Sequence, residues 1–147
     1  MSIRLSQSLA GLAIVVLVLV TSTTSLAQSD NLERSLVGST WLAEDIGGHG
    51  VAHGVRTTIE FGAPGRIDGL AACNRYTGPV SFDRDGVAFG DLASTRMMCP
   101  DSIMDQEQRF FEALAKIDRL ALADDGRTLI AYAGGAPVMR LSRTVEK

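Results

Sequence analysis

The sequence predicts an α+β fold, in which one helix packs across a curved antiparallel sheet of about eight short strands. Two observations predict it. From Leu36 onward, short apolar segments alternate with turn signals at close spacing, as antiparallel strands and hairpins do. Between Cys99 and Asp118, in contrast, the apolar residues fall at helical spacing. One helix that covers the apolar face of one sheet is a stable two-layer arrangement.

The N-terminal segment 1–27 has the three parts of a secretory signal peptide. Arg4 supplies a positive charge, Leu9–Val20 is an unbroken run of 12 apolar or glycine residues, and Ser25-Leu26-Ala27 fits the small-x-small cleavage pattern. A membrane-spanning helix needs about 20 apolar residues, and polar residues end this run too early. We therefore predict cleavage after Ala27, a periplasmic or secreted location, and a product that does not span a membrane.

The rest of the chain is predicted to form one domain. Removal of 1–27 leaves 120 residues, a usual size for a single domain. We expect a flexible leader at 28–35, the domain at 36–143 and a short tail at 144–147. Because 1–27 holds one Arg and no acidic residue, the remainder carries 13 Lys and Arg against 17 Asp and Glu, a net charge of −4. A chain without a basic face is a poor partner for nucleic acid.

The strands follow from alternation of apolar residues and from the turns between them. In chain order the expected strands are Trp41–Ile46, Thr57–Phe61, Arg66–Ala72, Val80–Phe82, Val87–Phe89, Leu120–Leu122, Leu129–Ala131 and Pro137–Ser142. Asp83–Gly86 has the residues of a hairpin turn. Asp124–Gly126 is expected to turn the chain so that Leu120 and Leu122 face the strand Leu129–Ala131.

The helix is expected to begin at Ser102 and to run for about 15 residues. Ser102 is the predicted N-cap, and Asp105 three residues later completes a capping-box pattern. Asp105 and Glu107 suit the positive N-terminal end of a helix, and Lys116 suits the negative C-terminal end. Phe110 and Phe111 are expected to anchor the helix against the sheet.

The chain has two cysteines, Cys73 and Cys99. Two cysteines in an oxidising compartment usually pair with each other, so we predict a disulfide. With 25 residues between its ends, this bond would contribute about 3.5 kcal/mol through the entropy of the unfolded chain. The alternative is a nucleophilic thiol, which needs an activating base. No histidine lies near either cysteine in the sequence.

Two polar segments contain these cysteines, Cys73-Asn74-Arg75-Tyr76-Thr77-Gly78 and Thr95-Arg96-Met97-Met98-Cys99. With the strand around Trp41 before them and the helix after them, they resemble the META domain, a family that includes the HslJ-type bacterial heat-shock proteins. The resemblance covers residues 36–143. One departure is Ala72, where the family often has glycine. We therefore expect that the backbone at Ala72 needs no positive φ angle.

The resemblance implies a compartment and a fold rather than a reaction. META proteins are mostly bacterial envelope or secreted proteins linked to stress tolerance, and the HslJ branch is associated with heat shock and with resistance to the antibiotic novobiocin. Their fold is similar to that of pilot proteins that hold lipid in a cleft. No catalytic activity is settled for the family, and a fold does not fix a function.

The candidate binding site is a polar patch made by Asn74, Arg75, Tyr76, Thr95 and Arg96. Arginine suits the recognition of carboxylate or phosphate groups because its planar guanidinium donates two parallel hydrogen bonds. The patch would therefore bind an anionic group. The alternative is structural, since asparagine is common in turns and polar side chains often satisfy the backbone.

Metal binding is a weaker prediction. His49 and His53 lie in a glycine-rich loop and offer two ligands, one fewer than a catalytic zinc needs from the protein. Met97, Met98 and Met104 flank Cys99, and their sulfur atoms suit Cu(I). The favoured alternative for these methionines is packing in the core where helix meets sheet.

These observations favour a non-enzymatic exported protein that needs no cofactor. The sequence has no nucleophile elbow and no phosphate-binding glycine motif. Our leading hypothesis is an envelope protein of stress or drug tolerance that binds a small hydrophobic ligand or an envelope partner. The alternative is a protein-binding module, such as an inhibitor of a lytic enzyme, that acts through the polar patch. A third hypothesis is weak metal binding in the periplasm.

Overall fold

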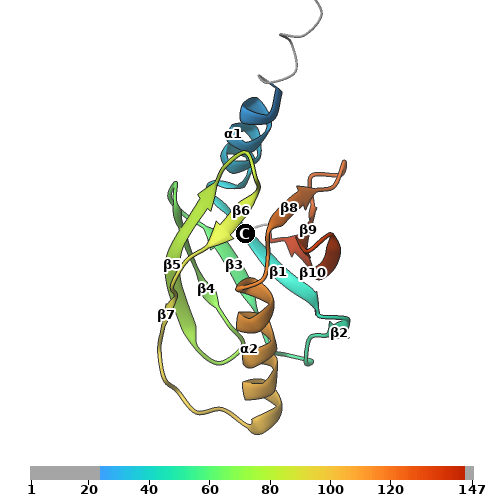
Figure 1. Cartoon of the computed structure of the whole chain (residues 1–147). Coiled ribbons are helices and arrows are strands. Elements are labelled where there is room, and N and C mark those ends of the chain that lie inside the picture. Colours follow the sequence, from blue (N-terminus) through green and yellow to red (C-terminus); the bar gives the residue numbers. More distant parts are fainter. Residues whose placement is uncertain (1–23, 145–147) are drawn as a thin grey trace, which may run out of the picture.

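The computed structural model describes residues 24–144, and side chains from Asp30 onward. Most of the predicted signal peptide lies outside the described residues. Figure 1 shows two helices and a strongly curved sheet. The elements are α1 (Thr24–Leu36), β1 (Ser39–Ile46), β2 (His49–Gly50), β3 (Thr58–Phe61), β4 (Arg66–Leu70), β5 (Arg75–Phe82), β6 (Val87–Phe89), β7 (Ala93–Ser94), α2 (Asp101–Leu114), β8 (Arg119–Leu122), β9 (Thr128–Ala133) and β10 (Ala136–Arg143).

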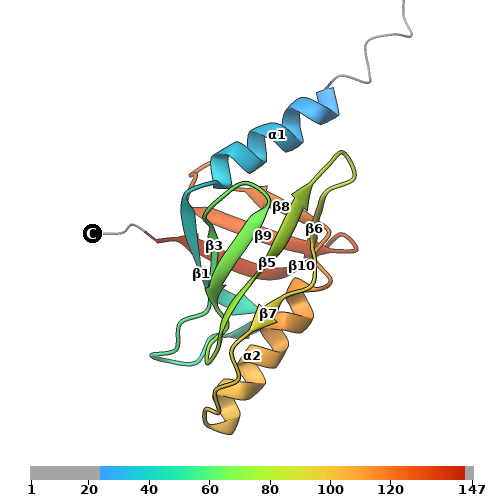
Figure 2. The same cartoon turned by 90° about the vertical axis from the view of Figure 1, so that its left-hand side faces the viewer.

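The sheet is antiparallel and bends into a nearly closed barrel. Its strand order is β6-β5-β4-β3-β1-β10-β9-β8, with β2 paired to β1 and β7 paired to β5. The two end strands meet where Val87 N donates a hydrogen bond to Asp118 O at 2.9 Å. Gly86 allows this approach, because its φ is +142° and a Cβ there would overlap Asp118 O. Figures 1 and 2 show α1 and α2 at opposite ends of the sheet.

The predicted α+β fold is confirmed. Inward-facing side chains from many strands fill one core, among them Trp41, Ile59, Leu129 and Leu141, all fully buried. The β8–β9 hairpin has the expected register, since Leu120 pairs with Ala131 and Leu122 with Leu129. The Asp83–Gly86 turn also forms, with Asp83 Oδ1 accepting hydrogen bonds from Asp85 N and Gly86 N.

The segment 28–35, for which a flexible leader is predicted, has helical conformation and belongs to α1. Its last turns are held by local bonds, such as Ser35 Oγ to Asn31 O at 2.8 Å. Leu32 and Leu36 are four residues apart on one face of the helix. Leu36 is fully buried and Leu32 packs on the core. These two leucines attach the C-terminal end of α1 to the barrel, although the segment is polar over most of its length. The predicted cleavage point after Ala27 falls within α1.

Helix α2 confirms the predicted helical segment but begins differently. It starts at Asp101, and Pro100 occupies the N-cap position without a side-chain cap hydrogen bond. The prediction of Ser102 as N-cap was therefore wrong, because Pro100 already sets the entry of the chain and its carbonyl accepts from Ile103 N and Met104 N. Phe110 is fully buried, as expected of an anchor.

Candidate functional site

The site begins at the disulfide between Cys73 and Cys99, which the structure contains as predicted. Its Cα atoms are 6.0 Å apart, and it ties the β4–β5 turn to the segment before α2. Ala72 precedes it with φ +78°, the one positive φ angle at a non-glycine residue among residues 24–144. Our expectation for Ala72 was therefore wrong. The turn into Cys73 needs a left-handed residue, and alanine adopts that conformation at a cost of about 1–2 kcal/mol.

Asn74 joins three segments around this disulfide. Its Oδ1 atom accepts hydrogen bonds from Thr95 Oγ1 at 2.8 Å and from Met97 N at 2.7 Å. Its Nδ2 atom donates to Met97 O at 3.2 Å and to Glu107 Oε1 at 2.8 Å. The Oδ1 and Nδ2 atoms of Asn74 thus each make two hydrogen bonds inside the protein, and the residue is 3% exposed.

Glu107 on α2 completes this network. Its Oε2 atom accepts hydrogen bonds from Cys73 N at 3.1 Å and from Asn74 N at 2.7 Å. A buried carboxylate is stable only when hydrogen bonds replace its water shell, and here three donors do so. We call Asn74, Thr95, Met97 and Glu107 the clamp, because together they fix the segment 95–97 and the turn at Cys73 relative to α2.

The role of Glu107 is not evident from the sequence, where this residue is only a charge that suits the N-terminal end of a helix. The one signal is spacing, since Glu107 stands three and seven residues before Phe110 and Leu114 and shares their face of the helix. In the structure Gln106 and Glu107 are both buried. Buried polar residues on a helix indicate specific partners, but the sequence does not name them.

Tyr76, two residues after Asn74, lies in an aromatic cluster with Phe110 and Phe111 of α2. Its ring centroid is 5.4 Å from that of Phe110 and 5.7 Å from that of Phe111. Its hydroxyl donates to Thr58 O at 2.8 Å. Burial, with the nearby carboxylates of Glu60 and Asp68, raises the pKa of Tyr76 well above its ordinary value. Gly69 makes room for the ring, because a Cβ there would lie 2.8 Å from Tyr76 Cε1.

The structure therefore divides the predicted polar patch into an inner and an outer part. Asn74 and Tyr76 are buried and serve the fold, whereas Arg75, Thr95 and Arg96 are exposed. Thr95 N donates to Arg75 O at 3.0 Å, so the two exposed arginines lie on adjacent backbone segments. Binding of an anionic group at these residues stays a prediction.

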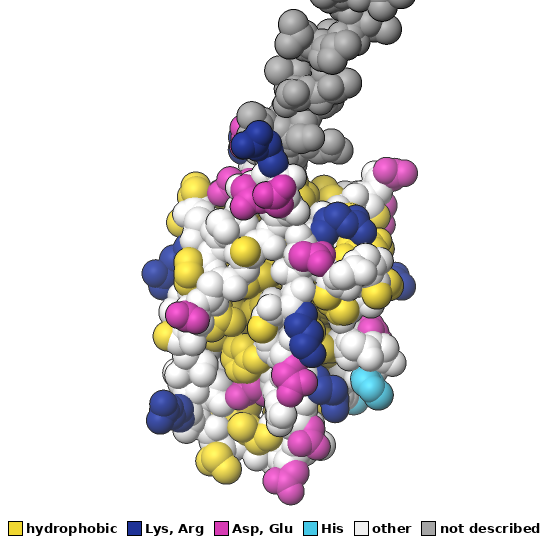
Figure 3. Space-filling view, viewed as in Figure 1, with side chains coloured by type: hydrophobic (Ala, Val, Ile, Leu, Met, Phe, Trp, Pro, Cys, Tyr) yellow, Lys and Arg dark blue, Asp and Glu magenta, His cyan; other side chains and the backbone are white. Residues whose placement is uncertain are grey.

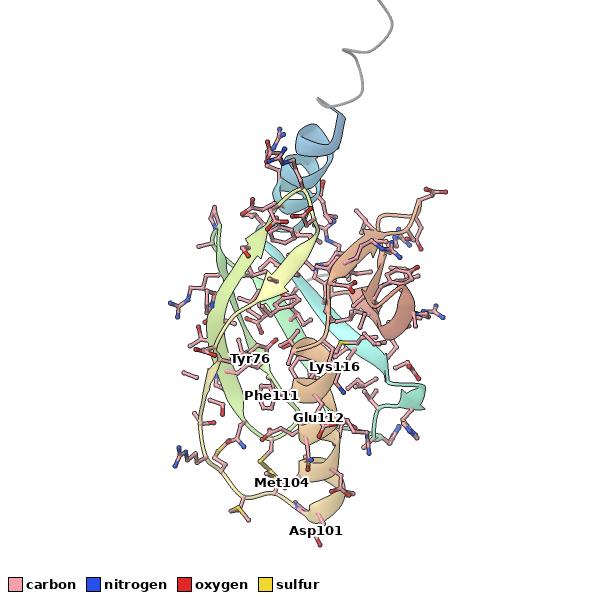
Figure 4. The ribbon with its side chains drawn as sticks, in the orientation of Figure 1. Tyr76, Asp101, Met104, Phe111, Glu112 and Lys116 are labelled. Carbon is pink, nitrogen blue, oxygen red and sulfur yellow. A yellow bond between two sulfur atoms is a disulfide. The ribbon has the colours of Figure 1, made fainter. Side chains whose placement is uncertain are left out.

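A cleft runs along α2 beside the segment 89–98. Figure 3 shows hydrophobic side chains gathered on this face, and Figure 4 shows Phe111 extending from α2 toward Tyr76. The cleft has two hollows that share Ser94 and Phe111. The phenylalanine hollow, of about 410 Å³, is lined by Phe89, Gly90, Asp91, Leu92, Ser94, Phe111 and Ala115.

The second part of the cleft is the methionine hollow, of about 540 Å³. Its lining residues are Asn74, Ser94, Thr95, Arg96, Met97, Met98, Met104, Asp105, Glu107, Gln108, Phe111 and Glu112. Met97 is 53% exposed and Met98 is 88% exposed. The favoured prediction that these two methionines pack in the core was therefore wrong. The clamp holds their backbone at the surface, so the side chains line the cleft instead.

A separate hollow, also of about 540 Å³, lies at the other end of the barrel. We call it the end hollow. It is formed where α1 crosses the β5–β6 hairpin and β8, and its apolar lining includes Leu32, Phe82 and Leu122. It contains no residue of the predicted patch.

The two histidines lie away from the cleft. His49 is in β2 and His53 is in the loop that follows, and both are exposed. Over residues 24–144, no group of three or more His, Cys, Asp or Glu side chains is arranged to hold a metal ion. Metal binding by His49 and His53 stays a prediction.

Comparison with protein families agrees with the order of these parts. The family model of the META domain matches residues 34–145, which include the disulfide, the clamp and both hollows of the cleft. The chain belongs to the META domain family. In this META domain the two motifs around the cysteines form one wall of the cleft, and α2 forms the other.

Two solved structures share the fold of this META domain. An NMR structure of a protein from Burkholderia xenovorans is similar with a TM-score of 0.65 and 20% identity, over 79% of this chain and 88% of the other. A second NMR structure has a TM-score of 0.60 and 21% identity, over 75% of this chain and 92% of the other. No curated protein sequence matches significantly. At these identities the likeness shows the fold alone.

Neither described helix of the META domain has the length and apolar character that crossing a bilayer requires. This finding applies to residues 24–144.

Proposed function

We propose that this META protein is an exported, non-enzymatic envelope protein that binds a small hydrophobic ligand in the cleft along α2. The observation that carries the proposal is the phenylalanine hollow, where Phe89, Leu92 and Phe111 line a space of about 410 Å³ at the surface. Pockets that hold small ligands are mostly apolar and measure roughly 300–1,000 Å³. Export rests on the predicted signal peptide, and a role in stress tolerance rests on the family.

The hollow favours a ligand that is held by apolar contact. Two phenylalanines, a leucine and an alanine are among its seven lining residues, and burial of apolar surface yields about 25 cal/mol of free energy per Å². The Asn74 and Glu107 side chains nearby are already occupied by the clamp. An alkyl or acyl chain, or a flat aromatic molecule, fits these properties better than a sugar or a nucleotide does.

The test is a titration of the protein, purified from a bacterial periplasm, with anilinonaphthalene sulfonate and with palmitate. Leu92→Gln places an amide in the phenylalanine hollow, and Leu122→Gln places one in the end hollow; both leucines are half-buried. We expect wild type and Leu122→Gln to bind equally, and Leu92→Gln to bind about 10-fold more weakly. Loss of binding in Leu122→Gln alone would move the ligand to the end hollow. No binding by the wild type would refute the proposal.

A second candidate function is binding of an envelope protein, such as a lytic enzyme that the META protein inhibits. Arg75, Arg96, Met97 and Met98 are exposed at one end of the cleft. Arginine and methionine are enriched in protein interfaces. This hypothesis predicts a stoichiometric partner captured from periplasmic extract by the wild type and lost from the Arg75→Ala/Arg96→Ala variant. Equal capture by both proteins would contradict it.

A further inference from the structure

We infer that Met97, Met98 and Met104 form a thioether site for Cu(I) in the methionine hollow. All three line this one hollow, and they come from two elements, the segment before α2 and the first turns of α2. Three of the five methionines of the chain are thus gathered at one place. The inference does not depend on ligand binding in the phenylalanine hollow.

The exposure of the methionines is the first argument. Among the described side chains, Met97 and Met98 are the only large hydrophobic ones that are exposed. Met139, in contrast, is 2% exposed and belongs to the core. Packing thus explains Met139 but leaves the pair at the cleft without a structural role. Two adjacent thioethers in solvent are free to reorient toward a ligand, because methionine has three rotatable side-chain bonds.

The second argument is that the backbone which carries these sulfur atoms is fixed. The backbone of Met97 makes two hydrogen bonds with the Asn74 side chain. Met97 N donates to Asn74 Oδ1 at 2.7 Å, and Met97 O accepts from Asn74 Nδ2 at 3.2 Å. Cys99 is fixed by the disulfide, so Met98 lies between two anchors. Met104 is held in α2, where its N atom donates to Pro100 O at 3.1 Å. Figure 4 shows Met104 on the side of α2 that faces this segment.

The third argument is chemical. Thioether sulfur is a soft, neutral ligand that suits Cu(I). Both cysteines are in the disulfide and are not available as thiolate ligands. The other charged groups that line the hollow are Arg96 and the carboxylates of Asp105, Glu107 and Glu112. With three carboxylates against one guanidinium, the hollow favours a cation over an anion.

The experiment measures Cu(I) affinity of the disulfide-intact protein by competition with a chromophoric chelator, with ascorbate as the reductant. Native mass spectrometry with Ag(I) provides the stoichiometry. We expect one metal ion per chain. The triple variant Met97→Leu/Met98→Leu/Met104→Leu, which keeps apolar side chains, should bind about 100-fold more weakly. Met139→Leu and the His49→Ala/His53→Ala variant should bind as the wild type does.

The pH dependence of Cu(I) affinity provides an independent readout. Thioethers carry no proton at any ordinary pH, whereas an imidazole ligand must be neutral to bind a metal. Affinity that is equal at about pH 7.5 and about pH 5.5 is therefore expected, since unperturbed imidazole titrates near pH 6.5. X-ray absorption of the Cu(I) complex should show sulfur ligands.

Four results would overturn the inference. They are no binding by the wild type, loss of binding in the histidine variant, unchanged binding in the triple leucine variant, and binding only after reduction of the disulfide. Trp41 fluorescence verifies that each variant is folded, since Trp41 is the single tryptophan and is fully buried. The triple variant should still bind anilinonaphthalene sulfonate, so failure of the copper site and failure of the proposed function are distinguishable.

Discussion

Single residues of the cleft wall act mainly by satisfying hydrogen-bonding groups within the protein. Asn74 makes four side-chain hydrogen bonds, and its partners are up to 33 residues away in the chain. Tyr76 directs its one polar atom to Thr58 O and presents its ring to Phe110 and Phe111. Asn74 and Tyr76, which the sequence suggests as binding residues, therefore support the wall of the cleft. A ligand or a partner would contact their exposed neighbours Arg75, Thr95 and Arg96 instead.

Burial of Tyr76 predicts a loss of stability in alkali. Because the folded state raises the pKa of Tyr76 above the ordinary value of 10.0, it binds the phenolic proton more tightly than the unfolded state does. The stabilising contribution is fully present below about pH 10 and falls as the pH rises further. Urea unfolding at several pH values, followed by Trp41 fluorescence, should show a smaller alkaline decrease for Tyr76→Phe than for the wild type.

The Tyr132→Phe variant provides a direct control for this prediction, because Tyr76 is then the only tyrosine. Its phenolate absorbance should rise together with unfolding. A phenolate band near pH 10 in the folded protein would contradict the prediction.

At the scale of elements, α2 is attached to loops on both of its sides through two adjacent polar residues. Gln106 Nε2 donates to Thr57 Oγ1 at 3.0 Å, and Gln106 Oε1 accepts from Ala52 N at 2.6 Å. Glu107 accepts from the turn at Cys73 and Asn74. Phe110 supplies apolar contact from the same helix. These contacts set the position of α2 relative to the sheet and therefore the width of the cleft.

Removal of the Glu107 carboxylate should weaken the attachment of α2 to the turn at Cys73 and Asn74. Glu107→Ala leaves three buried donors without an acceptor, and we expect a loss of about 3 kcal/mol in the free energy of unfolding. Glu112→Ala, on the same helix but exposed, should change it by less than about 0.5 kcal/mol. Urea unfolding of both variants tests this difference. Equal stability of the two variants would show that Glu107 does not hold the clamp together.

At the scale of the whole molecule, long-range contacts close the barrel and the disulfide adds to them. The two ends of the strand order meet at Val87 and Asp118, and α1 and α2 lie at opposite ends (Figure 2). The disulfide joins residues 26 apart in sequence. It therefore restricts the unfolded chain more than it adds contacts to the folded one.

Replacement of both cysteines by serine should lower the free energy of unfolding by about 3.5 kcal/mol, the entropy of closing a loop of this length. Domains of this size have stabilities of about 5–15 kcal/mol, and the clamp remains in place, so the variant should still fold. Urea unfolding with Trp41 fluorescence measures the change. A stability equal to that of the wild type would contradict the entropic explanation.

The sequence by itself determined the features that depend on local periodicity and residue chemistry. Alternation of apolar residues located the eight strands of the main sheet order but not the short strands β2 and β7, and β5 begins at Arg75 rather than at the predicted Val80. The β8–β9 register followed from where Leu120 and Leu122 lie relative to the Asp124–Gly126 turn. Helical spacing located α2. Two cysteines and a predicted export signal were enough to predict the disulfide.

Only the tertiary structure decided which polar groups meet and which apolar groups stay exposed. The pairing of Asn74 with Glu107, the exposure of Met97 and Met98, and the packing of Leu32 and Leu36 on the barrel all depend on contacts between distant segments. The positive φ of Ala72 likewise follows from the turn that the disulfide and clamp impose. Burial and hydrogen-bond partners are properties of the packed chain, and local sequence patterns do not contain them.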